Sequence, residues 1–200
     1  MRPLVAALVL TAGLAVPLAA QMTVDFTPEL GAFVPLQNLL NGPPVTRHQT
    51  RFAIGGRVGL WLGPSFGLET TAAYSEPKVV TRVNGVNVDA TDANIFAGSL
   101  RGVVKLGSAD RGVALLLSAG AGLVSNGGAY GSGRSGHLKF APAAGLGFLA
   151  RLTRDVDARL DVDGYDYRPQ LTDVDGVVTT YRRQYDLLIM LGLTGRFGGM

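Results

Sequence analysis

Short stretches of this sequence place an apolar side chain at every second position, and this alternation constrains the fold more than any other feature. In residues 51–62, Phe52, Ile54 and Val58 fall on one face, whereas Arg57 and several very small residues fall on the other. A period of two is typical of a β-strand whose faces meet different surroundings. Eight such stretches follow one another, so the sequence predicts an all-β fold.

Connections of two kinds join the eight predicted strands. The strands are expected at residues 23–34, 50–62, 66–75, 93–106, 112–124, 137–152, 156–167 and 184–197. Short connections (63–65, 107–111 and 153–155) alternate with long polar ones (35–49, 76–92, 125–136 and 168–183). This alternation predicts an eight-stranded antiparallel up-and-down β-barrel, with turns at one end and long loops at the other. The even strand number places both termini at the turn end.

The first twenty residues form a separate unit. Arg2 supplies a positive charge, residues 4–18 are apolar, and Ala19 and Ala20 are small residues suited to cleavage. We predict a signal peptide at 1–20 and one barrel domain at 21–200. An N-terminal membrane anchor is the less favoured alternative, because the apolar run is short and contains glycine and proline.

The mature chain is nearly neutral and contains no cysteine. Removal of Arg2 from 18 basic residues leaves 17 against 15 acidic residues, a net charge of +2. This balance, without a basic cluster, argues against nucleic-acid binding. The lack of cysteine excludes disulfides, thiolate catalysis and thiolate metal sites, and no residue pattern indicates a cofactor.

The hydropathy of the chain favours a membrane environment. Charged residues make up 16% of the chain, against about 25% in soluble domains, and the mean hydropathy is +0.25. The longest charge-free stretch, 112–133, is apolar only as far as Val124 and is too rich in glycine to cross a membrane as a helix. A closed barrel is the other way to satisfy the backbone in lipid. We therefore predict a transmembrane barrel.

Aromatic residues on the apolar face gather near the two ends of the strands. Those near the long loops are Phe52, Tyr74, Phe96, Phe140 and Tyr185, and those near the short turns are Phe66, Phe148 and Phe197. Two aromatic girdles around an aliphatic band are typical of a barrel in a bilayer. On the opposite face, charge alternates with glycine and alanine, which weaken a solvent-exposed sheet but suit a narrow lumen. Both features favour a membrane barrel over a secreted lipocalin-like barrel with an apolar interior.

The charged face is expected to line the lumen with nearly balanced charge. Its ionisable residues are Asp25, Glu29, Arg51, Arg57, Glu69, Arg101, Lys105, Lys139, Arg151, Asp157, Arg159, Asp161, Asp163, Asp186 and Arg196. The interior of an eight-stranded barrel is filled by its side chains, and buried charges must pair. We predict a lumen charge network of Arg57, Glu69, Arg101, Lys105, Lys139, Arg151, Arg159, Asp161, Asp163 and Arg196. Glu69 is expected to pair with Arg57 and Arg101. A filled lumen is favoured over a conducting pore.

This pattern resembles the small eight-stranded outer-membrane barrels of the OmpA and OmpX type, over residues 22–197 and without a specific motif. The resemblance implies a Gram-negative outer membrane, periplasmic termini, contact with lipid and lipopolysaccharide, and insertion by the barrel-assembly machinery. Family members commonly end on an aromatic residue. Here Phe197 is followed by Gly198-Gly199-Met200, so Phe197 is the candidate for that signal.

Some barrels of this size modify lipid A, and two histidines are the candidates for such chemistry. The deacylase type places His and Ser two positions apart on one strand. His48 is followed by Gln49-Thr50 and His137 by Leu138-Lys139, so neither fits. We predict that the protein is not an enzyme.

Two acidic segments, 161–164 and 173–176, begin like calcium loops. An EF-hand aligned on Gly164 would have Arg159 as its first ligand, and one aligned on Gly176 would have Leu171. We therefore predict no metal site. Asp161 and Asp163 are expected to pair with arginines of the lumen, and 173–176 to form a surface turn.

The complete barrel pattern without a catalytic constellation predicts a non-enzymatic outer-membrane protein, either structural or acting through its loops. The alternative is a small porin or ligand-uptake barrel. A lipid A-modifying enzyme or a secreted lipocalin-like binder fits less well. No residue pattern identifies the partner of the loops.

Overall fold

The computed structural model describes residues 22–39, 45–109, 112–128, 138–168, 170–172, 178–180 and 182–197, without the side chains of Asp89, 170–172 and 178–180. The predicted signal peptide at 1–20 lies outside these residues. Among the described residues, no helix is both long enough and apolar enough to cross a membrane.

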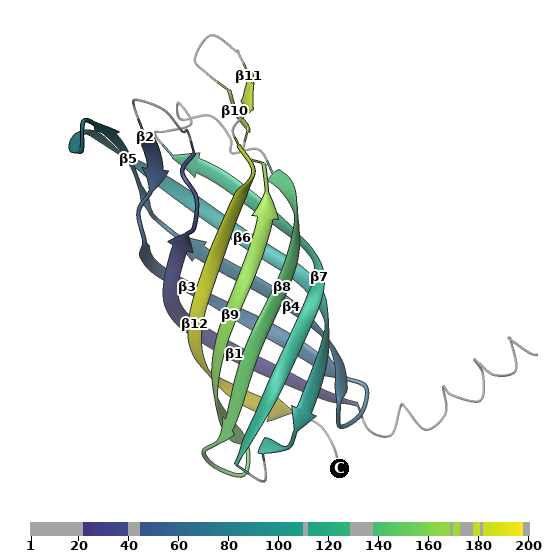
Figure 1. The fold of residues 1–200 in the computed structure, drawn as a ribbon. Helices are drawn as coiled ribbons and strands as arrows, with labels where there is room; N and C mark the ends of the chain where they lie inside the picture. Colours follow the sequence, from purple (N-terminus) through teal and green to yellow (C-terminus); the bar gives the residue numbers. More distant parts are fainter. Residues whose placement is uncertain are drawn as a thin grey trace, which may run out of the picture.

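Eight strands close into an antiparallel barrel, which confirms the predicted fold class (Figure 1). They are β1 (Thr23–Pro35), β3 (Arg51–Trp61), β4 (Phe66–Ser75), β6 (Val86–Gly107), β7 (Val113–Gly128), β8 (Leu138–Arg151), β9 (Val156–Tyr167) and β12 (Gln184–Phe197). Each strand pairs with the next in this order, and β12 pairs back with β1. Every strand of the ring therefore has a hydrogen-bonded neighbour on both sides. β4, β9 and β12 begin and end at the predicted residues.

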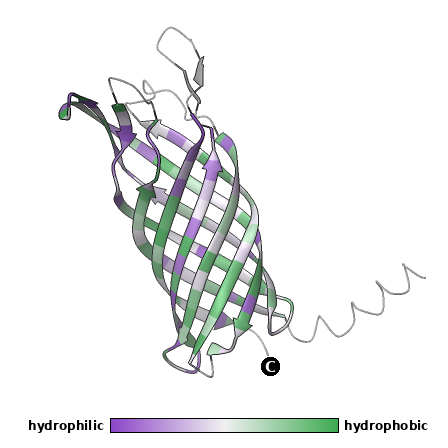
Figure 2. Cartoon of the chain, viewed as in Figure 1, coloured by the Kyte–Doolittle hydropathy of each residue, from purple (hydrophilic) through white to green (hydrophobic). Residues whose placement is uncertain are grey.

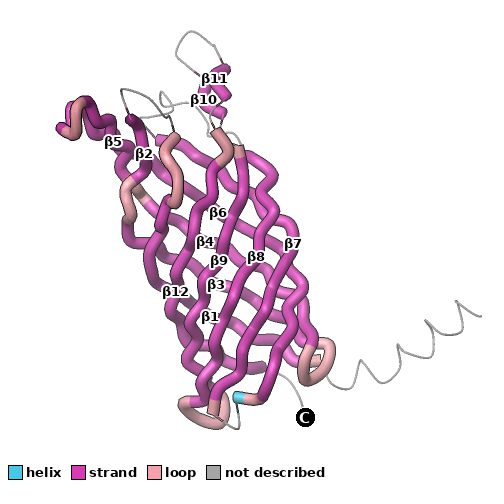
Figure 3. Tube along the Cα trace, in the orientation of Figure 1, coloured by secondary structure: helices cyan, strands magenta, loops and turns pink. Residues whose placement is uncertain are grey.

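Strand structure continues beyond the ring at the loop end, where the sequence pattern predicts only loops (Figure 3). β2 (Val45–His48) pairs with β5 (Lys78–Val83), and β5 pairs with the first part of β6. The turn between β5 and β6 is Asn84-Gly85, with φ of 50° and 81°. Positive φ at both residues is what a two-residue type I′ hairpin requires. The prediction of a plain loop at 76–92 was wrong, because this Asn-Gly signal was overlooked.

Strand structure also extends into the last long connection. β10 (Gln170–Thr172) and β11 (Val178–Thr180) pair with each other within the predicted loop 168–183. The predicted surface turn at 173–176 lies outside the described residues, as does His137.

Large apolar side chains are exposed on the strands of the barrel. Figure 2 shows hydrophobic positions along the length of these strands. Near the middle of their strands, Leu117, Leu146 and Ile189 are exposed on the apolar phase of the alternation, and Leu60 is half-buried. All eight residues predicted for the aromatic girdles are exposed. Phe26, near the turn end of β1, is a further exposed aromatic residue that the prediction left out.

The interior is built in three levels. At the loop end, buried apolar and aromatic residues form a cluster that includes Phe33, Ile95 and Leu188. At the turn end, a second cluster includes Trp61 and Leu116. The middle level is charged. Arg51 was predicted to face inward, but it is exposed at the loop-side end of β3, where the wall no longer encloses it.

Candidate functional site

The middle level of the lumen is a layer of seven charged side chains from five strands. They are Glu29 on β1, Arg57 on β3, Glu69 on β4, Arg101 on β6, and Arg159, Asp161 and Asp163 on β9. All seven side chains form ion pairs, and each side chain is at most 3% exposed. We call this set the charge layer.

Glycines on neighbouring strands make room for the charge layer. Glu29 lies in register with Gly55 on one side and Gly192 on the other. Asp163 lies opposite Gly145, and a Cβ at Gly145 would overlap the Asp163 carboxylate. Long charged and very small residues therefore alternate along the inner face for a packing reason. The head groups of Glu29 and Asp163 occupy the space that glycines on neighbouring strands leave free.

Arg57 is the centre of the layer. Its Nε donates to Glu29 Oε1 at 2.6 Å, its Nη1 to Glu69 Oε1 at 2.8 Å, and its Nη2 to Asp163 Oδ2 at 2.9 Å. Asp161 lies 3.4 Å from Nη1. One guanidinium thus meets four carboxylates, an arrangement suited to the planar five-donor geometry of arginine.

Arg159 and Arg101 complete the layer. Arg159 Nη1 lies 2.7 Å from Glu69 Oε2, and its Nε donates to Asp161 Oδ2 at 2.7 Å. Arg101 faces Glu69 across the β4–β6 ladder but donates to Asp163 instead, and also to Ser99 Oγ at 2.7 Å. The predicted Glu69–Arg101 ion pair was therefore wrong. The two residues share a register position, but β9 supplies a closer partner for each from across the lumen.

The other predicted network members lie outside this layer. Arg151 and Arg196, both half-buried, donate to Asp157 near the turn end. Lys105 lies at the turn end with its ammonium 4.3 Å from the centre of the Trp61 ring. Lys139 is half-buried on β8, next to its loop-side end.

Sequence reasoning missed Trp61 as a lumen residue. Its Nε1 donates to Asp25 Oδ2 at 2.5 Å, and its ring closes the turn end with Leu116 and Leu149. The available signal was the alternation itself, because Trp61 shares the inner phase with Arg57.

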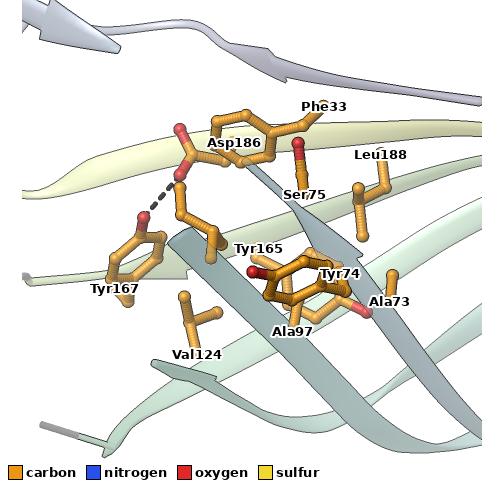
Figure 4. Close-up of a pocket in the computed structure, with 11 residues that line it drawn as sticks. Phe33, Ala73, Tyr74, Ser75, Ala97, Val124, Tyr165, Tyr167, Asp186 and Leu188 are labelled. Carbon is orange, nitrogen blue, oxygen red and sulfur yellow. Dashed lines mark hydrogen bonds between the residues drawn. The ribbon is translucent and has the colours of Figure 1, made fainter. Parts of the chain in front are cut away.

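A small cavity lies between the charge layer and the loop end (Figure 4). Phe33, Ile95, Val124 and Leu188 are among its apolar lining residues. Asp186 borders it and accepts a hydrogen bond from Tyr167 Oη at 2.5 Å, which Figure 4 marks. The cavity has about 10 Å³ of space for a water molecule, which is room for about one.

The remaining candidates for chemistry are isolated. His48 is buried at the loop end, edge-on to the Phe33 ring with 6.2 Å between ring centres, and its Nδ1 has no hydrogen-bond partner. Burial lowers the pKa of His48 to about 4. Within the described part of the chain, no three His, Cys, Asp or Glu side chains are grouped so that they could hold a metal ion.

Comparison with solved structures places this fold among small outer-membrane barrels. OprG from Pseudomonas aeruginosa matches with a TM-score of 0.65 and 12% identity, over 89% of this chain and 96% of that one. The outer-membrane protein AlkL, solved in lipid bilayers, matches with a TM-score of 0.55 and 14% identity, over 89% and 90% of the two chains. Neisserial surface protein A matches with a TM-score of 0.53 and 14% identity, over 88% and 97%. No family model and no curated protein matches the chain. The chain has the fold of the small eight-stranded outer-membrane barrels.

Proposed function

We propose that the chain is a non-enzymatic integral protein of the bacterial outer membrane, with a structural or interaction role at its loop end and a lumen closed by the charge layer. The charge layer is the observation that carries this proposal. Seven charged side chains from five strands pair with one another across the interior, and the side chains occupy the space that a solute would need.

The arrangement of the wall supports the membrane location. Most of the exposed large apolar side chains lie on the outer wall, and the middle of the lumen is lined by ionisable ones, whereas a lipocalin-like binder has an apolar interior and a polar outer surface. A water-soluble barrel would leave this apolar outer surface in contact with solvent. Outer-membrane lipid, including lipopolysaccharide, is accordingly the proposed surrounding of the wall, and the barrel-assembly machinery the proposed route of insertion.

The hairpin of β5 and β6 supports an interaction role. It projects beyond the ring at the loop end (Figure 1). Val83, Val86 and Val88 are exposed around its tip. Three exposed valines on a projecting hairpin suit an apolar contact with a partner.

Single-channel recording in planar bilayers tests the closed lumen. Purified wild-type protein is expected to give no resolved conductance steps. A double variant, Arg57→Ala with Glu69→Ala, removes two large side chains from the charge layer and is expected to give steps under the same conditions. Steps from the wild-type protein would reject the closed lumen in favour of a small porin or uptake barrel.

Surface labelling tests the location and the orientation. A short epitope inserted between Asn84 and Gly85 is expected to bind antibody on intact cells. The same epitope in the turn at 63–65 is expected to bind only after the outer membrane is opened, because that turn is proposed to face the periplasm with both termini. Equal access to the two epitopes on intact cells, or recovery of the protein in the soluble fraction, would reject the proposal.

A further inference from the structure

A row of small residues crosses the outer wall on four neighbouring strands. Gly102 on β6 pairs with Ala119 on β7, Ala119 with Ala144 on β8, and Ala144 with Gly164 on β9. All four line a shallow apolar depression with Leu117 and Leu146 among its other lining residues. Larger side chains flank the row, so its glycines and alanines leave a groove in the wall. We call it the wall groove.

The wall groove rises toward the loop end. Gly102 lies near Gly107, the turn-side end of β6, whereas Gly164 lies near Tyr167, the loop-side end of β9. The next residue in register is Leu187 on β12, which also lines the depression. An elongated apolar group lying in the groove would therefore have its upper end at β9 and β12, close to the rim of the barrel.

A second depression continues the wall groove upward. It shares Ala144, Gly164 and Leu187 with the groove, and adds Leu36, Pro142, Asp166 and Tyr185 among others. The β8–β9 ladder ends at the pair Ala143–Tyr165, next to Pro142, which has no N–H to donate. Asp166, half-buried on the outer face of β9, is a polar side chain of this depression, whereas the Asp186 carboxylate points into the lumen toward Tyr167. Polar and apolar surfaces thus meet where the groove approaches the rim.

A basic pocket at the rim continues the same path. It shares Leu36 and Tyr185 with the second depression, and its other lining residues are Gln37, Asn38, Arg182 and Arg183. Gln184 ties the two sides of the pocket together, because its Nε2 donates to the carbonyl oxygens of Asn38 at 3.1 Å and of Arg182 at 3.2 Å. We call the site formed by Gln37, Asn38, Arg182 and Arg183 the rim pocket.

The charge of the rim pocket favours a phosphate. Arg183 makes a bidentate ion pair with Asp166 and stacks 5.4 Å from the centre of the Tyr185 ring. This ion pair neutralises Asp166 and holds Arg183 in place, and it occupies Nε and Nη2 of Arg183. Arg182 is exposed and supplies the net positive charge of the pocket. Guanidinium groups bind phosphate through paired N–H donors, and the side-chain amides of Gln37 and Asn38 supply further donors.

We infer that one phosphate-bearing lipid of the outer leaflet binds along this path, with its phosphate in the rim pocket and an acyl chain in the wall groove. This inference rests on the proposed membrane location. Tyr185, one of the two tyrosines of the loop-side girdle, lies between the two parts, at the level where head groups meet acyl chains. The apolar groove below and the arginines above complement the two halves of such a lipid, and free phosphate would leave the groove empty.

Native mass spectrometry of the full chain, released from detergent micelles that contain diphosphoryl lipid A, tests the inference. The wild-type protein is expected to retain one lipid. Arg182→Ala, which removes a phosphate donor, and Gly164→Leu, which fills the groove, are each expected to lower retention at least tenfold. A Cβ at Gly164 has no contact closer than 3.6 Å, so the leucine can point into lipid without disturbing the wall.

Two matched control variants test whether a loss of lipid is specific to the proposed site. Arg154→Ala removes an exposed arginine at the turn end, and Gly195→Leu adds a leucine to the outer wall near the turn end, where the nearest contact of a Cβ is 3.6 Å away. Both are expected to retain lipid as the wild-type protein does. Phosphatidylglycerol and inorganic phosphate are separate arms. Retention of phosphatidylglycerol by the same residues would support the phosphate-lipid site and widen its range.

Each remaining outcome would overturn the inference. Loss of lipid with Arg182→Ala alone, together with equal binding of inorganic phosphate, would mean a simple anion site. Loss with Gly164→Leu alone would mean an apolar contact without head-group recognition. No loss with either variant would mean nonspecific lipid. If the protein enters bilayers but fails these tests, only the lipid site is rejected, whereas failure to enter bilayers rejects the proposed function itself.

Discussion

Arg57 of β3 and Asp163 of β9 form a hydrogen-bonded ion pair of 2.9 Å between strands that are not neighbours in the barrel. β1 and β12 separate these strands along the wall, so the pair crosses the lumen. It joins two parts of the ring that backbone hydrogen bonds do not connect directly. The charge layer thereby links side chains of the wall across the interior as well as around it.

Removal of Glu69 is expected to destabilise the barrel. Glu69→Ala leaves Arg57 and Arg159 each short of a carboxylate, and breaking a buried pair in this way costs ~3–5 kcal/mol. The midpoint of thermal unfolding in detergent should fall clearly below that of the wild-type protein. Glu76→Ala is the control, because Glu76 only accepts an exposed hydrogen bond from Tyr74 Oη at 2.9 Å. Equal melting of the two variants would contradict a structural role for the charge layer.

Replacement of Gly145, which lies opposite Asp163, by alanine is expected to destabilise the barrel. A Cβ at Gly145 would overlap Asp163 Oδ1 and lie 2.8 Å from Arg101 Nη1, so Gly145→Ala forces both head groups to move. We expect a loss of ~1–3 kcal/mol, measured by urea unfolding of the barrel in lipid vesicles. Gly164→Ala is the matched control on the outer wall and should be neutral or slightly stabilising, because alanine restricts the unfolded chain. A larger loss at Gly164 would reverse the assignment of the two faces.

Arginine at mid-wall should distinguish the lipid face from the lumen. Leu117→Arg is expected to cost roughly 2–4 kcal/mol in a bilayer. Ser118→Arg should escape that lipid penalty, although Ser118 Oγ lies 3.3 Å from Arg101 Nη1 and a second arginine there would crowd the lumen. Single cysteines at 117 and 118 give an independent measurement with a reagent that labels from the lipid phase. Equal labelling of the two positions would show that the predicted alternation of faces is wrong.

The pairing of β2 with β5 at the loop end should loosen in mild acid because of His48, which lies on β2. Burial lowers the pKa of His48 from 6.5 to about 4, so below pH 6.5 the opened form takes up a proton that the closed form resists. The closed form is fully stabilised above pH 6.5 and loses stability as the pH falls toward 4, by up to about 3 kcal/mol. Amide-exchange protection factors of β2 and β5, corrected for intrinsic pH effects, should fall between pH 7.5 and pH 5. The His48→Leu variant should show no such fall, and a fall of equal size would assign the effect to another group.

The strands and their faces could be predicted because they depend on local pattern. Alternation in a narrow barrel repeats every two residues, so Phe52 points outward and Arg57 inward wherever the ring places their strand. The first and last residues of β4 could be predicted for the same reason, because its alternation begins after the turn at 63–65 and ends where the long connection at 76–92 begins. β2 could not be predicted in this way, because it has four residues and pairs with β5 more than thirty residues away. β5 is also short, and its signal was the Asn84-Gly85 turn to β6 rather than a long alternation.

The alternation in the sequence was enough to assign most strand residues to the lumen or to the outer wall, because the strand period sets the face of each residue before any tertiary contact forms. Which of the lumen charges pair with each other depends on the closed ring. Glu69 and Arg101 share a register position, yet closure of the ring brings Arg159 to Glu69 and Asp163 to Arg101. A charged head group lies several bonds from its backbone, so in a closed barrel its nearest partner can come from a distant strand. The curvature of the ring sets the distance between the two head groups, and the sequence of one strand alone does not determine that distance.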